Sequence, residues 1–495
     1  MKEHNYDFSV PNRQSIFAII IIILKTFQLV IKQIFPLLLI LLIGKSLQKP
    51  SYLLLVVIAV SCLTLIISII QYFKTYFYIS GNELIVHKGI LRKSKISIPF
   101  DRIQSVHFEQ NMIQQICNVT QLKIETAGSD KTEFVFHAIE NARAHALRNY
   151  ISSHKTLANP VDDTDFSSVQ GSTAQDKILV LDIVDLIKIG ITENHIKSAG
   201  LIFVFLYWIF EKIQDVGIDM ESYPEEVSEW NWTFNIVITL VIFLFIISLI
   251  ISVVKTFLIN YELILFRTGN GFKLIKGLFN KKEISVSDNK LQLISWSNNV
   301  LKGWLGINDL YLSQASGHQW SAKQSIKIPG CGSQQINKII DQVFGSIAFE
   351  EVQYTGTDKK WFIRFAVIVS GLAVMLSTLL LIGNYTQMIW ITCVISGYFI
   401  LERFLAYRRI RYGYNTDVFF LKGGKWGKKT SILPIYKIQG CKIKQSPYQR
   451  KHNLCSITLF TASGSVSVPY IPLPSGQTMA DYFLFKIETE QINWL

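Results

Sequence analysis

Long apolar stretches occur in pairs along this chain, and each pair is followed by a longer polar stretch. The pairs are 15–44 with 52–72, 196–213 with 233–254, and 361–382 with 388–405. A helix that crosses a bilayer needs about 20 apolar residues, so the pattern predicts six transmembrane helices in three hairpins. As one helix, residues 15–43 would be about 43 Å long, which exceeds the hydrocarbon core of a bilayer, about 30 Å thick. We therefore expect the first part of this stretch to lie in the membrane interface.

The charges beside these stretches predict the orientation in the membrane. The connection 211–231 contains seven acidic residues and one basic residue, whereas arginines cluster between 403 and 411, directly after the third pair. Cytoplasmic loops are enriched in lysine and arginine. We therefore expect a multi-pass protein of the cell (inner, cytoplasmic) membrane with both termini and all three polar stretches in the cytoplasm. Lys45 and Lys49, in the first hairpin loop, argue weakly against this orientation.

Each polar stretch has the pattern of several short strands followed by one helix. Alternation of apolar and polar residues predicts strands at 95–98, 103–108, 122–125, 456–459 and 465–468. Helical spacing follows at 141–154, 333–344 and 475–488. This order predicts a small β-barrel or bent sheet with a C-terminal helix. The expected fold class is therefore mixed, with membrane α-helices and cytoplasmic β-domains.

The expected boundaries follow from these patterns. They are 1–75 for the N-terminal interfacial segment and transmembrane hairpin 1, 76–155 for β-domain 1, 156–195 for a linker and an amphipathic helix, 196–258 for hairpin 2, 259–347 for β-domain 2, 348–407 for hairpin 3 and 408–495 for β-domain 3. The amphipathic helix is expected at 178–191, where it would lie on the membrane or, as we expect, pack on the next unit.

The three polar stretches are copies of one another. Residues 96–129 align without a gap with 284–317, at an offset of 188, and with 431–464, at an offset of 335. One aligned position holds Asn118, Gly306 and Asn453, residue types that tolerate positive φ in a turn. Upstream, Gly89, Gly277 and Gly424 align, and a bulky apolar residue follows each of them two places later. The chain is thus predicted to be a triplicated unit of helix hairpin plus β-domain.

The repeated unit resembles a known family. A helix hairpin leads into Glu83-Leu84 and Lys88-Gly89, then the stretch 98–106 (IPFDRIQSV), then the stretch 125–128 (ETAG). This is similar to the bacterial membrane-flanked pleckstrin-homology-like (PH-like, bPH2) domain, and three copies on paired helices resemble the YdbT-like proteins. The third copy keeps Leu433-Pro434, whereas Ser287 stands where the second copy should have proline. The resemblance implies the fold, a part in envelope stress or in resistance to membrane-active peptides, and a smaller single-domain sister membrane protein as partner.

Composition and charge agree with a membrane protein and exclude several other classes. Hydrophobic residues make up 49% and charged residues 17%, against about 25% charged in ordinary soluble domains. This excludes a disordered chain and a disulfide-stapled secreted module. The formal net charge of +13 arises near the membrane-proximal turns, which disfavours a nucleic-acid groove. The nine histidines and six cysteines form no metal-ligand or catalytic motif, so we expect no enzyme, no cofactor and no metal site.

Basic residues gather in the first hairpin of each polar stretch. They are Lys88, Arg92, Lys93 and Lys95 in the first copy, Lys276, Lys281 and Lys282 in the second, and Lys425, Lys428 and Lys429 in the third. Anionic headgroups attract each such cation by about 1 kcal/mol, so these hairpins are predicted to contact an anionic lipid surface. The structural alternative is a solvated turn whose lysines keep edge strands apart.

The functional hypothesis is a non-enzymatic integral membrane scaffold whose three PH-like domains bind anionic lipid, partner proteins or one another. Domains this small have marginal cores, so a homo- or hetero-oligomer is expected. The alternative is a transporter or channel with regulatory PH-like domains. That alternative requires polar residues converging within the spans, and the candidates there are Ser370, Ser377, Thr378 and Thr392.

Overall fold

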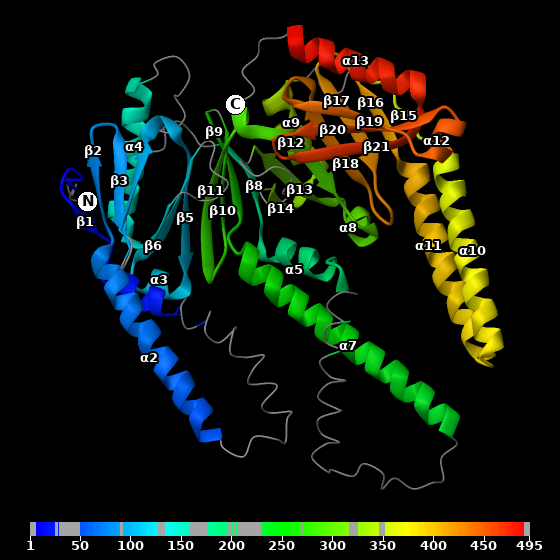
Figure 1. The fold of residues 1–495 in the computed structure, drawn as a ribbon, viewed down its shortest axis with the longest axis horizontal. Coiled ribbons are helices and arrows are strands. Elements are labelled where there is room, and N and C mark those ends of the chain that lie inside the picture. Colours follow the sequence, from blue (N-terminus) through cyan, green and yellow to red (C-terminus); the bar gives the residue numbers. More distant parts are fainter. Residues whose placement is uncertain are drawn as a thin grey trace. The chain divides into compact units, whose positions relative to one another are not determined.

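The computed structural model describes residues 6–24, 28, 50–89, 93–126, 134–158, 176–195, 200, 204, 229–269, 271–315, 325–345 and 352–489. The chain divides into two compact units, Met1–Lys177 with Leu265–Ser287, and Ile178–Ile264 with Asp288–Leu495. Figure 1 shows three groups of strands, each followed by a helix along the chain. The described elements confirm the predicted combination of sheets with apolar helices.

The three β-domains share one order of elements: three strands, a 3-10 turn, a strand, a short helix, two strands and a longer helix. The first has β2 (Tyr76–Ser80), β3 (Glu83–Lys88), β4 (Ser94–Pro99), η1 (Phe100–Arg102), β5 (Ile103–Asn111), α3 (Met112–Ile116), β6 (Val119–Thr126), β7 (Phe134–Glu140) and α4 (Asn141–Ala158). The second has β9 (Ile264–Thr268), β10 (Gly271–Lys276), β11 (Asn280–Ser287), η3 (Asp288–Lys290), β12 (Leu291–Ser297), α8 (Val300–Trp304), β13 (Ile307–Gln314), β14 (Ser325–Gly332) and α9 (Ser333–Phe344). The third has β16 (Arg411–Tyr414), β17 (Val418–Gly423), β18 (Lys429–Pro434), η7 (Ile435–Lys437), β19 (Gly440–Lys444), α12 (Pro447–Lys451), β20 (Leu454–Thr461), β21 (Gly464–Pro472) and α13 (Leu473–Thr489).

The backbone confirms the internal repeat at its two turn positions. Gly89, Gly277 and Gly424 have φ of 112°, 106° and 114°. At the second aligned position Asn118, Gly306 and Asn453 have φ of 51°, 68° and 52°. Positive φ is accessible mainly to glycine and asparagine, so all three copies turn the chain in the same way at the same places.

One hydrophobic core fills the first β-domain, another fills the third, and a smaller one joins residues 18–22 and Tyr72 to the first β-domain. In the first domain the fully buried side chains include Phe77, Leu84, Phe100, Leu122 and Phe136, which come from both groups of strands and the turn between them. Helix α4 closes this core with three apolar side chains, those of Ala144, Leu147 and Ile151. Burying one large apolar side chain contributes about 1.5–3 kcal/mol, so these few residues hold the two groups of strands together.

Neighbouring domains are joined strand to strand. The sheet orders are β1-β2-β3-β4, β7-β6-β5-β11-β10-β9-β8, β14-β13-β12-β18-β17-β16-β15 and β19-β20-β21. Thus β11 of the second domain pairs antiparallel with β5 of the first, with Lys282 opposite Glu109. In the same way β18 of the third domain pairs with β12 of the second, with Lys429 opposite Ser297. In the alignment of the repeats, Glu109 corresponds to Ser297 and Lys282 corresponds to Lys429. Both junctions therefore have the same register.

A short strand that sequence patterns did not predict precedes the helices of each repeat. These strands are β1 (Asn12–Arg13), β8 (Asp176–Val180) and β15 (Thr355–Gly356). The helix expected at 178–191 is therefore shorter: α5 spans Ile183–Ile191, and its N-cap residue Asp182 has extended φ and ψ of −83° and 168°. The strand β8 occupies the residues before it, which explains the late start of the helix.

Long apolar helices precede the β-domains. They are α2 (Pro50–Lys74), α7 (Glu229–Asn260), α10 (Lys360–Ile382) and α11 (Ile389–Arg409). Among the residues that the structure describes, three segments are long and apolar enough to cross a membrane: Val241–Asn260, Lys360–Ile382 and Thr386–Arg409. The predicted stretch 196–213 and most of 15–44 lie outside the described residues. Residues 17–24 are helical, and there Ala18, Ile21 and Ile22 pack with Tyr72 and Val119.

The junction between β12 and β18 depends on a close approach at Gly427. A Cβ placed on Gly427 would overlap the backbone carbonyl oxygen of Asn298. We therefore expect Gly427→Ala to destabilise the full chain by about 1–3 kcal/mol, the usual cost of overpacking, measured as a lower midpoint of thermal unfolding in detergent.

Gly303→Ala provides the matched control, because a Cβ on Gly303 would meet no atom closer than 3.9 Å. Its unfolding midpoint should equal or exceed that of the parent, since alanine is favoured over glycine inside a helix. Equal midpoints for Gly427→Ala and the parent would show that the strands do not approach this closely.

Candidate membrane-contact site

The hairpin of each domain presents an apolar tip between basic residues. The hairpins β3–β4, β10–β11 and β17–β18 each contain the glycine with φ above 100°. The tip residues Phe279 and Trp426 are 49% and 38% exposed, and the aligned Leu91 lies outside the described residues. An exposed aromatic side chain beside cations suits the interface of a membrane, where aromatic rings and basic groups both concentrate.

The first hairpin leaves its described cations in solvent. Lys88, Lys93 and Lys95 are exposed, and the Lys88 Nζ lies 5.6 Å from the ring centroid of Phe134. Arg92 lies outside the described residues. The predicted cations of this hairpin that the structure describes are therefore available to an anionic surface.

The second hairpin divides its cations between solvent and the junction with β5. Lys281 is exposed, whereas Lys276 is half-buried. The Lys282 Nζ lies 3.3 Å from Glu109 Oε1, and Lys123 lies 2.7 Å from the other oxygen of Glu109. Burial alone would raise the pKa of Glu109, but the two ammonium groups outweigh it and hold this pKa below its ordinary value. The main contact of Lys282 is therefore with the first domain, in the β5–β11 junction.

The third hairpin lies against a membrane helix. The Lys425 Nζ lies 2.8 Å from Glu402 Oε1 of α11, and the Trp426 ring stacks on Tyr398 with centroids 5.6 Å apart. Tyr398 precedes the helix end at Arg409 by three turns, or about 16 Å along the axis. The tip of this hairpin therefore lies well along α11 rather than at its end.

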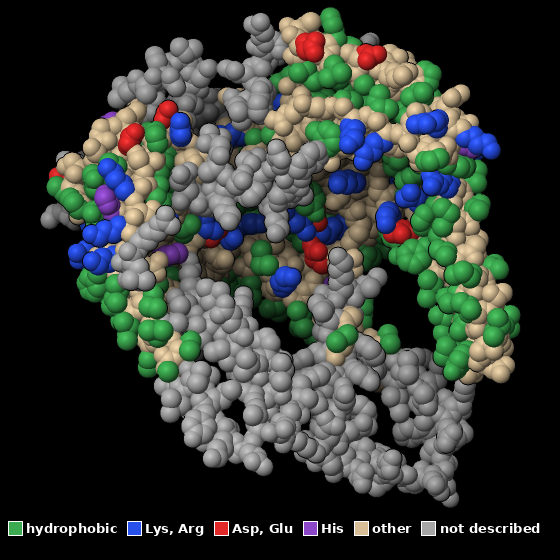
Figure 2. Space-filling view, viewed as in Figure 1, with side chains coloured by type: hydrophobic (Ala, Val, Ile, Leu, Met, Phe, Trp, Pro, Cys, Tyr) green, Lys and Arg blue, Asp and Glu red, His purple; other side chains and the backbone are tan. Residues whose placement is uncertain are grey.

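Figure 2 shows how hydrophobic and basic side chains are distributed along α10 and α11. The pair α10 and α11 carries hydrophobic side chains along its length, and lysine and arginine side chains gather at the end next to the β-domain. Lys428 and Lys429 are exposed, while their backbones take part in the junction: Lys428 bonds Asn298, and Lys429 lies opposite Ser297. The arrangement places cations beside the predicted membrane boundary.

The candidate polar residues of α10 and α11 are hydrogen-bonded or lie on the helix surface. Ser377 and Thr392 are hydrogen-bonded to each other across α10 and α11 at 3.0 Å, and Thr378 donates to the Met375 carbonyl of its own helix. Ser370 is exposed on the helix surface. Such bonds between hydroxyl groups hold helices together in a membrane.

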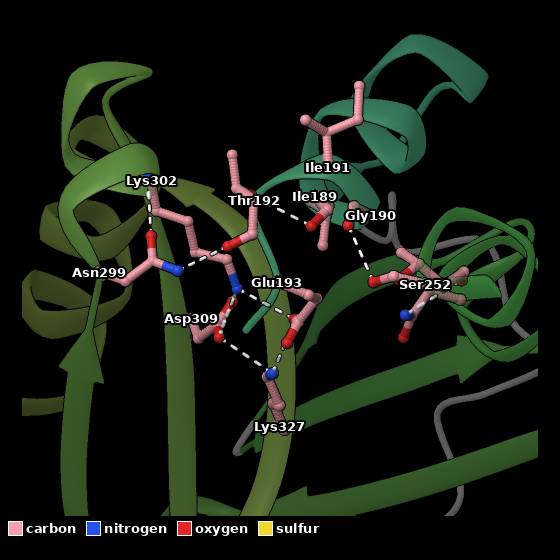
Figure 3. Close-up of polar contacts among 12 residues, drawn as sticks. Ile189, Gly190, Ile191, Thr192, Glu193, Ser252, Asn299, Lys302, Asp309 and Lys327 are labelled. Carbon is pink, nitrogen blue, oxygen red and sulfur yellow. Dashed lines mark hydrogen bonds and ion pairs between the residues drawn. The ribbon is translucent and has the colours of Figure 1, made fainter. Parts of the chain in front are cut away.

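A buried ion cluster connects the chain before the second helix hairpin to the second β-domain (Figure 3). The Lys302 Nζ lies 2.8 Å from Asp309 Oδ2 and 3.0 Å from Glu193 Oε1. Lys327 contacts the same two carboxylates at 2.9 and 3.3 Å. Lys302 and Asp309 are only 3% and 7% exposed, so each needs the other to remain charged in the interior.

The segment that carries Glu193 is packed tightly on α7. The Ser252 hydroxyl donates to the Gly190 carbonyl at 2.9 Å, as Figure 3 shows. A Cβ on Gly190 would lie 2.7 Å from the Val253 Cα, so the crossing of α5 and α7 requires glycine. On its other side α5 reaches β14, where Ile189 meets Gly330. This packing favours the expected role of the amphipathic helix within the protein.

Acid weakens the cluster through Glu193. Burial alone would raise the pKa of Glu193, but Lys302 and Lys327 together lower it below 4.5. A carboxylate whose pKa falls on folding stabilises the folded state above its unfolded pKa. That contribution is lost as the pH falls from about 4.5 through the lowered pKa of Glu193 in the folded state.

Sequence patterns alone did not predict this cluster, although the internal repeat contains a signal for it. Lys302 aligns with Gln114 and Gln449, which are 2% and 4% exposed. Both glutamines form a capping box at the start of a short helix. The first and third copies bury a glutamine at this position, whereas the second copy buries Lys302. A buried lysine requires an acidic partner, and Asp309 and Glu193 are the partners of Lys302. The His107 Nε2 lies 3.4 Å from Glu125 Oε2 on the neighbouring strand.

Comparison with known proteins agrees with this architecture. The family model for the bacterial PH domain matches residues 19–155, 202–346 and 364–484. The chain belongs to the bacterial PH domain family. The three matches confirm the internal repeat of PH-like domains that the sequence predicts.

One relative matches most of this chain. It is 22% identical over 420 residues, or 80% of this chain and 82% of the relative, to the UPF0699 transmembrane protein YdbT of Bacillus subtilis (strain 168). With the apolar helices described above, this identifies a membrane protein with internal PH-like repeats. Among the described residues, no group of three His, Cys, Asp or Glu side chains could hold a metal ion.

We expect Lys302→Met to destabilise the full chain by about 3 kcal/mol, the lower end of the range for breaking a buried ion pair, because Lys327 still faces Asp309. The measurement is chemical unfolding in detergent at neutral pH. The double variant with Asp309→Leu should recover part of the loss, because no buried charge then lacks its partner.

The matched control is Lys188→Met on the same segment. Lys188 and Asp185 form an ion pair at 3.3 Å whose side chains are 49% and 41% exposed, so removing it should change stability by less than about 1 kcal/mol. If both lysine variants lost the same stability, the cluster would contribute no more than a surface pair.

Proposed function

We propose that this protein is a non-enzymatic membrane scaffold whose chained PH-like domains lie on an anionic lipid surface. The observation that carries the proposal is the third hairpin, where Trp426 stacks on Tyr398 of α11 and Lys425 pairs with Glu402. A hairpin held against a candidate membrane span brings its remaining cations, Lys428 and Lys429, to headgroup level.

The proposed arrangement in the membrane is six helices in three hairpins, with both termini and all three β-domains in the cytoplasm. The acidic connection 211–231 and the arginines near the end of α11 and directly after it support this orientation. The junctions β5–β11 and β12–β18 support it as well, because β-domains that pair directly must lie on one side of the membrane.

Labelling of single cysteines in intact cells tests the orientation. A cysteine introduced at Glu225 should react with a membrane-impermeant maleimide from outside. Cysteines at Ser129, Ser316 and Ser463 should react only after permeabilisation, because the bilayer separates the β-domains from the reagent. The parent chain, with its own six cysteines, gives the background, and external labelling at any of the last three sites would contradict the six-span arrangement.

Neutralising the first hairpin tests the lipid contact. In a fragment of residues 76–158, which contains nearly all of the first domain's core, replacing Arg92, Lys93 and Lys95 with glutamine should weaken binding to acidic vesicles about a hundredfold at low salt. The estimate is about 1 kcal/mol for each cation near the surface, and the loss should shrink as salt rises.

Arg102→Gln is the matched control, because Arg102 is exposed but lies at the other end of β4 from the hairpin. It should change vesicle affinity by less than about threefold, since a charge beyond a Debye length contributes little. Circular dichroism of all three fragments checks that they are folded. Equal binding of the triple variant and the parent at low salt would contradict the lipid contact.

A further inference from the structure

The third domain repeats the edge that receives a neighbouring strand in the other two. The strands β5 and β12 each pair with a strand of the following domain. The corresponding strand β19 pairs with β20 on one side. On the other side it has no strand partner within the part of the chain that the structure describes. Its exposed Lys442 and Lys444 and half-buried Cys441 and Ile443 alternate along this free edge.

The free edge of β19 is built in the same way as the occupied edge of β5. At the end of β5, the Gln110 side chain donates to the Val119 carbonyl at 3.0 Å, and Asn111 caps α3 with a capping box. After β19, the aligned Gln445 side chain donates to the aligned Leu454 carbonyl at 2.8 Å, and Ser446 caps α12 with a capping box. The third domain therefore offers a preformed acceptor edge.

The first domain has the complementary donor edge. Its strand β4 aligns with β11 and β18, the two strands that enter the junctions, and is paired only with β3 among the described residues. The outer edge of such a strand exposes backbone N–H and C=O groups that can pair with another strand. Lysines on this edge do not exclude pairing, because β11 carries Lys281 and Lys282 and pairs nevertheless.

We propose that β19 of one copy pairs antiparallel with β4 of a second copy, which makes a third junction of the kind found twice within the chain. The repeat offsets set the register, with Lys444 opposite Ser94 and Ile443 opposite Lys95. Residues directly opposite share a face of the sheet, so Lys95 lies on the other face from Lys442 and Lys444. No like charges are then directly opposed.

The expected partner of the β19 edge is a second copy of this chain. It carries the donor strand whose aligned copies already fill β5 and β12, and it would stand in the same membrane with the same hairpin-to-domain order. A head-to-tail contact of this kind generates a closed ring or an open row of copies. The junction uses backbone groups and does not depend on lipid binding.

Two differently tagged full-length copies in one membrane test this junction. One carries Ser94→Cys and the other Lys444→Cys, because residues opposite each other in antiparallel strands have Cα atoms within disulfide range. Mild oxidation of native membranes should move both tags to one band at twice the chain mass. Each copy expressed alone should remain at the mass of one chain.

The control for reactivity is Ser297→Cys with Lys429→Cys in one chain, the equivalent pair in the β12–β18 junction, which should oxidise within the chain. Lys442→Cys in place of Lys444→Cys tests the register and should cross-link far less.

If the control oxidises but the tagged copies do not cross-link, the proposal is overturned. Cross-linking only in a chain that carries both Ser94→Cys and Lys444→Cys, without a mass change, would show closure within one chain instead. Protection of both cysteines from maleimide without cross-linking would assign the edges to a different protein.

Discussion

Backbone pairing between edge strands is the interaction on which the rest of this structure depends. Each β-domain is small; the core of the first is built around side chains such as Phe77, Leu122 and Phe136, and small cores are marginal alone. An edge strand also exposes unpaired N–H and C=O groups. Placing β11 on β5 and β18 on β12 satisfies these groups and joins each domain to the next. Triplication of one unit thus produced a chain of domains, because every copy carries both a donor and an acceptor edge.

Membrane helices and sheets are coupled by polar contacts at their boundary. The cluster of Glu193, Lys302, Asp309 and Lys327 ties the segment after α5 to the second domain, while Ser252 ties α5 to α7. Buried charges of this kind are weak sources of stability, but breaking one is costly. The cluster therefore defines one position for the helix relative to the sheet, whereas apolar packing alone would permit sliding.

The basic hairpins serve two purposes at once. In the second copy Lys282 pairs with Glu109 in the domain junction, and in the third copy Lys425 pairs with Glu402 on the membrane helix. The described lysines of the first copy remain exposed. Aligned hairpins therefore have different surroundings: the hairpin of the second copy lies on β5, and that of the third copy lies on α11. The lipid contact we propose should accordingly be strongest at the first hairpin.

The sequence by itself determined the features that depend on neighbouring residues: the apolar helices, the alternating strands, the C-terminal helix of each domain and the positive φ at Asn118, Gly306 and Asn453. Such features follow from periodicity and local backbone sterics. Only the tertiary structure decided which edge strands meet, because backbone hydrogen bonds between strands carry little side-chain information. It also decided the partners of Lys302, since Glu193 lies 109 residues away. Contacts over such separations depend on packing of the whole chain, and no local pattern contains them.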